Sequence, residues 1–136
     1  MEKKLKDYGV LENDIFPIIE KLMVEGFLNE KRFASAFASG KFRYKKWGRK
    51  RIINEMKRKG LSDELIDSGL SVLSQEEYTK TLDDLLTKKW KLLERKVDKD
   101  DYDSLMAAKQ KLVNYALQKG YENDIIWERM KAIVKN

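Results

Sequence analysis

The segment FRYKKWGRKRI, residues 42 to 52, concentrates the side chains that are best suited to binding a charged ligand. Six of its eleven residues are Lys or Arg, three are aromatic and one is glycine. From Lys41 to Gly60 there are ten basic residues and one acid, a net charge of +9, whereas the other 116 residues sum to −3. A local excess of positive charge attracts polyanions such as nucleic acid or an acidic protein surface. A merely solvated face of a highly charged protein is the alternative interpretation.

The spacing within this region separates binding side chains from structural ones. A helix from residue 49 to residue 59 turns Lys50 and Lys57 away from its apolar side, and it allows Arg51 to pair with Glu55. Gly48 frees the backbone so that the amides at the start of this helix can face an anion. We predict polyanion binding by Arg43, Tyr44, Lys45, Lys46, Arg49, Lys50 and Lys57, with Tyr44 as a base-stacking side chain. We predict structural roles for Trp47, Gly48, Ile52 and Met56.

The remaining composition argues against an enzyme. The chain has neither cysteine nor histidine, which removes disulfides, thiolate nucleophiles, imidazole acid–base catalysis and ordinary zinc sites. No glycine-rich phosphate motif occurs. The acidic run from Asp98 to Asp103 departs from a calcium loop, because its sixth position is Asp103 instead of glycine and its twelfth is Lys109 instead of glutamate. We interpret this run as a polar turn, and we predict a protein that is not an enzyme and uses no metal or cofactor.

The elements that position the basic segment are all predicted to be helices. The hydrophobic periodicity is helical throughout, and no long stretch alternates like a strand. The first complete helix is expected from Glu30 to about Gly40, with Asn29 as its cap. Ser62 and Ser74 are expected to cap two later helices. Five aromatic side chains are predicted to lie in the core: Phe33, Phe37, Phe42, Trp90 and Trp127.

The chain also repeats itself. When it is aligned on Gly9, Gly60 and Gly120, six columns at fixed offsets are apolar in all three copies without any gap. An additional helix precedes the second and third copies, but the first copy begins at Met1 and has no room for one. We therefore predict an all-α fold, an elongated tandem array of three-helix, helix-turn-helix-like repeats whose first repeat is incomplete. The expected divisions are a partial repeat over 1–27, a central repeat over 28–73 and a C-terminal repeat over 74–136.

Residues 25–70, EGFLNEKRFASAFASGKFRYKKWGRKRIINEMKRKGLSDELIDSGL, resemble the RecX family of bacterial regulatory proteins. The resemblance is carried by short motifs in the order typical of that family: Gly26-Phe27-Leu28, Asn29-Glu30, Arg32-Phe33-Ala34, Arg43 to Lys46, Trp47-Gly48, Arg51-Ile52, Glu55-Met56 and Lys59-Gly60. The flanking units match by the repeat register alone. Members of the family usually have one more helix before the point at which this chain begins, so we expect a shortened or truncated start.

The resemblance implies a non-enzymatic regulator, mainly an inhibitor, of the RecA recombinase. It implies binding in the groove of the RecA filament on single-stranded DNA, with consequences for strand exchange, ATP turnover, recombination, DNA repair and SOS control. The implied partners are the recombinase filament and single-stranded DNA, which is contacted directly or through the filament. Neither the sign of the regulation nor direct contact with DNA follows from the sequence.

Two other functions stay open at this point. The first is a free-standing DNA-binding helix-turn-helix module, such as a transcriptional repressor, which needs a recognition helix that reads bases. Asn54 and Arg58 are the candidate base-reading side chains. The second is a protein-interaction solenoid that uses no nucleic acid.

Location and self-association complete the expectations. No apolar run is long enough to span a membrane and the N-terminus has no signal-peptide core, so a cytoplasmic protein is expected. The incomplete first repeat leaves apolar residues such as Leu5, Ile15 and Ile19 uncovered. Exposed apolar surface favours association, which predicts weak self-association through the N-terminal end.

Overall fold

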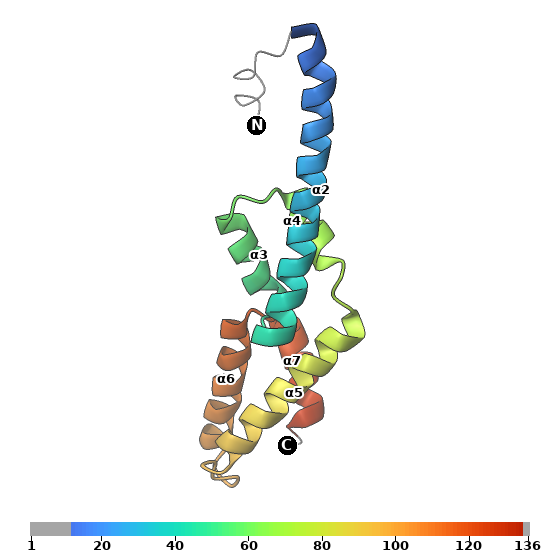
Figure 1. Cartoon of the computed structure of the whole chain (residues 1–136). Helices are drawn as coiled ribbons and strands as arrows, with labels where there is room; N and C mark the ends of the chain where they lie inside the picture. The colour runs from blue at the N-terminus through green and yellow to red at the C-terminus, as the bar shows by residue number, and fades with distance from the viewer. Residues whose placement is uncertain (1–11, 135–136) are drawn as a thin grey trace.

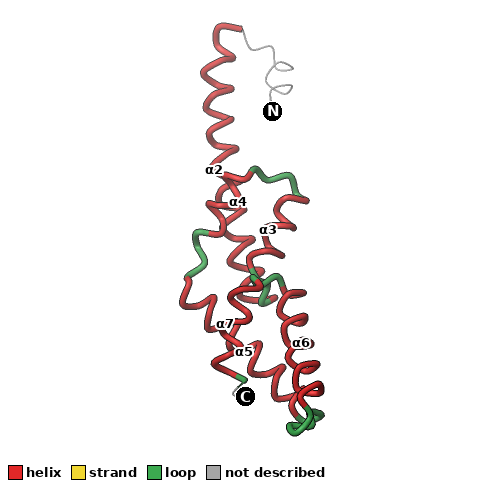
Figure 2. Tube along the Cα trace, turned by 180° about the vertical axis from the view of Figure 1, so that it is seen from behind, coloured by secondary structure: helices red, strands yellow, loops and turns green. Residues whose placement is uncertain are grey.

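All the regular secondary structure in the described part of the chain is α-helical. The structure is a computed structural model that describes residues 12–134, with side chains described from residue 29 onward. Figure 2 shows the helices of this range joined by loops, with no strand among them. Their bounds are Glu12–Lys45 for α2, Arg49–Arg58 for α3, Asp63–Leu70 for α4, Gln75–Glu94 for α5, Tyr102–Lys119 for α6 and Asn123–Ile133 for α7. The prediction of an all-α fold is confirmed.

The helices form two groups of three that follow each other along the chain. In the first group α2 packs mainly on α4, and α3 contacts both, while in the second group α5, α6 and α7 contact one another. Figure 1 shows the two groups end to end, with the N-terminal part of α2 extending beyond the first group. This arrangement confirms the predicted elongated array of three-helix units over the described residues. We call the two groups the second and third repeats.

Equivalent turns at two glycines explain the repeated apolar register. Gly60 follows α3 with a φ of +84°, and Gly120 follows α6 with a φ of +100°, a backbone conformation that favours glycine. In both turns the glycine amide donates to the carbonyl three residues back. The next amide, from Leu61 or Tyr121, donates to the carbonyl five residues back. The third predicted pivot, Gly9, lies outside the described residues.

α2 differs from the prediction because it is one continuous helix of 34 residues. The predicted start after Asn29 and the predicted end near Gly40 are both wrong. A cap stabilises a helix end by only about 1 kcal/mol, and a glycine inside a helix costs about as much. Packing is the stronger term here: Ala34 and Ala38 are fully buried, and Gly69 of α4 lies directly against the Ala34 backbone. The division expected between residues 27 and 28 falls inside this helix.

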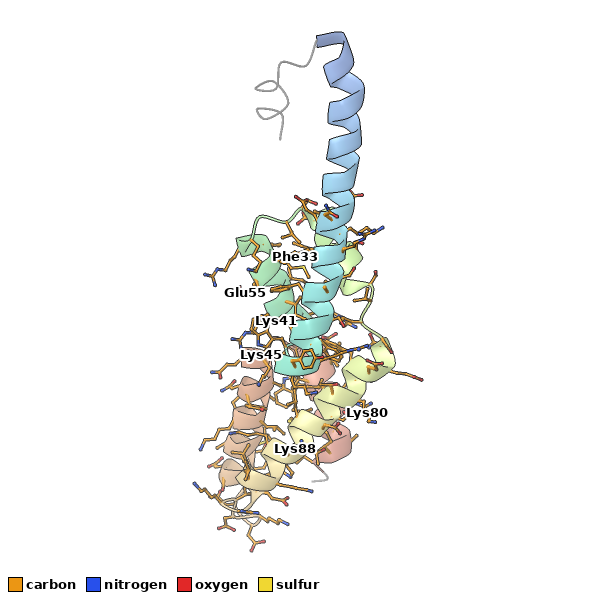
Figure 3. The ribbon with its side chains drawn as sticks, viewed as in Figure 1. Phe33, Lys41, Lys45, Glu55, Lys80 and Lys88 are labelled. Atoms are coloured by element: carbon orange, nitrogen blue, oxygen red, sulfur yellow. The ribbon has the colours of Figure 1, made fainter. Side chains whose placement is uncertain are left out.

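The predicted aromatic core is correct except at one position. Phe42 and Trp90 are buried, and Phe37 and Trp127 are half-buried against the core. Phe33, by contrast, is 45% exposed and touches the ring of Phe37 at 5.7 Å between centroids. Figure 3 shows Phe33 near the C-terminal end of α3, and its contact with Phe37 leaves much of the ring at the surface.

The two predicted serine caps are confirmed. The Ser62 hydroxyl accepts a hydrogen bond from the Leu65 amide, and the Ser74 hydroxyl accepts one from the Glu77 amide, each at 3.3 Å. The acidic run forms a polar turn in which Asp101 caps α6 by accepting from the amide two residues on, at 3.0 Å. None of the described helices is long and apolar enough to cross a membrane.

Candidate polyanion-binding site

The basic segment lies where the second repeat meets the third. α2 ends at Lys45 and α3 begins at Arg49. Between them Lys46 takes a left-handed conformation with a φ of 60°, and its carbonyl accepts a hydrogen bond from the Tyr121 hydroxyl at 3.0 Å. Trp47 is half-buried and packs on the core, as predicted for a structural residue. The turn is therefore held in place by residues of both repeats.

Six of the seven predicted binding residues are exposed: Arg43, Tyr44, Lys45, Lys46, Lys50 and Lys57. Tyr44 is 85% exposed, which leaves its ring free to stack. None of the five cations forms an ion pair with a described carboxylate. Arg43 and Lys45 lie in the last turn of α2, and cations are favoured at a helix C-terminus. That these residues bind a polyanion stays a prediction.

Arg49 differs from the other predicted binding residues because its side chain contacts the third repeat. Its guanidinium donates to the Glu122 carboxylate at 2.8 Å and to the Gln75 side-chain oxygen at 2.6 Å, and it lies 3.9 Å from the centre of the Tyr78 ring. These partners belong to the third repeat, so Arg49 fastens the two repeats together. Its positive charge is already paired, and we leave Arg49 out of the binding residues. Neither composition nor spacing within residues 42–52 indicates a partner that lies 73 positions away.

The predicted anion cradle at the start of α3 is also wrong. The Gly48 amide donates to the Lys119 carbonyl at 2.7 Å, and the Lys50 amide donates to the Gly120 carbonyl at 2.9 Å. The amide of Arg49 donates to the Tyr78 hydroxyl at 2.9 Å. The third repeat therefore occupies the donors that an anion would need.

A second predicted contact on α3 is replaced by others. Glu55 pairs with Arg58 at 2.9 Å instead of with Arg51. The Arg51 guanidinium lies 4.4 Å from the centre of the Trp47 ring. Ile52 and Met56, which are predicted to be structural, are fully buried. Because Arg51 does not pair with Glu55, its positive charge stays available at the surface.

Gly48 and Gly120 allow the two backbones to touch. A Cβ atom on Gly48 would lie 2.4 Å from the Gly120 carbonyl carbon, and one on Gly120 would lie 2.5 Å from the Cβ of Arg51. Real Cβ atoms essentially never come this close to other heavy atoms. The structural role predicted for Gly48 therefore takes a specific form, which is close contact between repeats.

Two buried tyrosines complete the contact between the repeats. The Tyr78 hydroxyl donates a short hydrogen bond to the Glu122 carboxylate and accepts one from the Arg49 amide. Burial, and then the bond to Glu122, raise the pKa of Tyr78 well above its ordinary value. Burial, and then the charge of Glu122, raise the pKa of Tyr121 in the same direction. Both phenols are therefore held protonated in the folded protein.

We expect the fold to weaken in alkaline solution. The native state keeps these phenolic protons to higher pH than the unfolded chain does, so their contribution is intact below the ordinary tyrosine pKa of about 10 and is lost above it. Each tyrosine should lower the free energy of unfolding by up to about 1.4 kcal/mol per pH unit in that range. Urea unfolding at several values between about pH 8 and pH 11 measures the slope.

Two variants test the assignment of this slope. Tyr78→Phe should lose about half of the tyrosine contribution, whereas Tyr44→Phe, at an exposed position, should change nothing. Equal alkaline slopes in the wild type and in Tyr78→Phe would contradict the assignment.

The fold and this surface define a helical-repeat protein with a basic surface at the junction of two three-helix units. Residues 29–70 match the family model of the second three-helix domain of RecX, and residues 75–130 match the model of its third three-helix domain. The chain belongs to the RecX family, which confirms the resemblance seen in the sequence.

Individual relatives agree with this assignment. The chain is 29% identical over 136 residues to a regulatory protein RecX of Clostridium perfringens, covering 100% of this chain and 61% of that protein. It is 31% identical over 133 residues to one of Clostridium acetobutylicum, covering 96% and 58%. It therefore spans about three-fifths of the length of these curated relatives. The crystal structure of RecX from Lactobacillus salivarius has the same fold, with a TM-score of 0.69 at 23% identity over 97% of this chain and 81% of that one.

Proposed function

We propose that this chain regulates a RecA-type recombinase, mainly by inhibition, and that it binds in the groove of the recombinase filament on single-stranded DNA. Membership of a family of regulatory proteins supports a role in control, without catalysis by this chain. The observation that carries the proposal is the exposed, unpaired basic cluster at the junction of two consecutive repeats. An elongated array can follow a helical filament and present these cations to its phosphates or acidic side chains.

The alternative, a free-standing DNA-binding module, has less support. Among the candidate base-reading residues, Arg58 is paired with Glu55, and the N-terminal amides of α3 are covered by the third repeat. In a three-helix module of this kind the recognition helix enters the major groove with its N-terminal residues. α4, the last helix of the second repeat, begins with Asp63 and Glu64, which phosphates repel.

Self-association through the N-terminal end stays a prediction. Leu5 lies outside the described residues, and the structure does not describe the side chains of Ile15 and Ile19. A concentration series in sedimentation velocity tests it, and a monomer at every concentration would contradict it.

The decisive experiment is the ATPase of RecA on single-stranded DNA, with and without this chain. We expect ATP turnover to fall, and we expect added salt to weaken the effect because charged contacts are screened. A protected site on duplex DNA, combined with unchanged ATP turnover, would replace the proposal by the repressor alternative. Inhibition that is insensitive to salt would favour a protein-interaction solenoid.

A further inference from the structure

A row of alternating cations and aromatic rings crosses the junction between the two repeats. Two cationic groups lie over each of three rings, and we call these eight residues the cation–ring row. Lys41 and Lys59 lie 5.5 and 5.6 Å from the centre of Phe37, Lys41 and Arg51 lie 5.0 and 4.4 Å from that of Trp47, and Lys89 and Lys119 lie 5.1 and 5.9 Å from that of Tyr115.

The row is continuous from one repeat to the next. Lys41 is shared by the rings of Phe37 and Trp47. Arg51 then connects the Trp47 ring to α6, because its guanidinium reaches the Gln118 carbonyl at 3.4 Å. Lys119 is the next residue of the chain. Figure 1 shows α3 and α6, which carry these two ends, one below the other on the same side of the molecule, and Figure 2 shows the same from behind.

The charges of the row are not compensated by the protein. None of its five cations forms an ion pair with a described carboxylate. Glu55, which lies four residues from both Arg51 and Lys59, is held by Arg58 instead (Figure 3 labels Glu55 and Lys41). Cations that share a ring repel each other, and a bound anion relieves that repulsion. The ring faces also attract the cations and restrict their motion before any ligand arrives.

We propose that the cation–ring row is a seat for the sugar–phosphate backbone of single-stranded nucleic acid, running across the junction from the second repeat into the third. A nucleic acid strand carries one negative charge per nucleotide at regular intervals. Such a strand fits a line of uncompensated cations better than the scattered carboxylates of a protein surface do. The inference rests on the proposed function and adds direct contact with DNA and a contribution from the third repeat.

The ligand groups that the row receives are phosphates, with bases stacking elsewhere. The faces of Phe37, Trp47 and Tyr115 are already occupied by cations. Tyr44, which is 85% exposed and carries no cation over its ring, is the side chain left for base stacking. Lys46, in the turn between α2 and α3, lines a depression of about 120 Å³ against α5, together with Thr81, Asp84, Leu85 and Lys88.

The test uses the full chain and a fluorescently labelled oligo(dT), with binding followed by anisotropy over a series of salt concentrations. The variant is Lys89→Gln with Lys119→Gln, because both residues lie in the third repeat and far along the chain from the basic segment. If both contact phosphates, the slope of log K against log salt should become less steep by about 1.4. If the variant and the wild type bind equally at about 1 M salt, the variant should then bind about 25-fold more weakly than the wild type at about 0.1 M salt.

The matched control is Lys91→Gln with Lys131→Gln, which removes the same charge from exposed positions of α5 and α7 that lie over no described ring. The control should keep the wild-type slope. An equal loss in both double variants, or no loss in the row variant, would overturn the inference.

The same series separates this inference from the proposed function. If the wild type inhibits the RecA ATPase but does not bind oligo(dT), the row faces acidic protein and the inference fails while the proposed function stands. If the row variant loses oligo(dT) binding but the wild type leaves the ATPase unchanged, the nucleic-acid seat stands and the proposed function fails.

Discussion

Gly120→Ala should lower the free energy of unfolding by about 3 kcal/mol or more, the largest stability effect that we expect from a single exchange. Two costs combine at this position. With a φ of +100°, any residue other than glycine is strained by about 1 kcal/mol. The new Cβ would also lie 2.5 Å from the Cβ of Arg51, and overpacking of this kind costs about 1–3 kcal/mol. Urea unfolding followed by circular dichroism measures the change.

At Gly60 and at Gly48 only one of the two costs applies, so these positions measure the costs separately. Gly60 has the same left-handed backbone, with a φ of +84°, but no atom lies within 4 Å of a Cβ placed there. Gly60→Ala should therefore cost about 1 kcal/mol, from backbone strain alone. Gly48 has an ordinary φ of −78° but a Cβ would meet the Gly120 backbone at 2.4 Å, so Gly48→Ala should cost about 2–3 kcal/mol from the collision alone. Equal losses at Gly60 and Gly120 would show that the repeats do not touch as described.

The sequence predicts those parts of the fold that depend on residues close together in the chain. The caps at Ser62 and Ser74 satisfy amides three residues on, and Gly60 and Gly120 act through their own backbone angles. These are local effects, so periodicity and turn chemistry are enough to find them. The continuous α2 helix is not predictable in this way. Whether the helix begins at Asn29 or runs through it depends on packing against α4, which comes later in the chain.

The candidate site shows the same division. Exposure of the basic segment follows from helical spacing, whereas the pairing of Arg49 with Glu122 joins residues 73 positions apart. Three of the six contacts in the cation–ring row do leave a signal in the local sequence. Phe37 and Lys41, Trp47 and Arg51, and Tyr115 and Lys119 are each an aromatic residue followed four positions later by a cation. That spacing places Phe37 with Lys41 on one face of α2 and Tyr115 with Lys119 on one face of α6, whereas Trp47 lies in the turn before α3. The contacts of Lys59 with Phe37, of Lys89 with Tyr115 and of Lys41 with Trp47 depend on the tertiary fold.

Exchanging Lys45, Lys46 and Lys50 together for alanine should weaken binding to the RecA filament more than any other change that leaves the fold intact. If all three contact phosphates, the slope of log K against log salt should become less steep by about 2, which extrapolates to an affinity about 100-fold weaker at about 0.1 M salt. Helix content should be preserved, because all three side chains are exposed. At Lys46, which has a φ of 60°, alanine and lysine are strained alike and the backbone bond to Tyr121 is kept.

The control for this variant removes three charges elsewhere, by exchanging Lys91, Lys99 and Lys131 for alanine, all of which are exposed. Net charge then falls equally in both proteins, so only the position of the lysines differs. A steeper loss in the junction variant assigns the salt dependence to the basic segment, because counterion release counts the phosphates that are contacted and not the total charge. An unchanged slope in the junction variant would mean that the +9 segment is only a solvated face, since charges that meet no phosphate release no counterions.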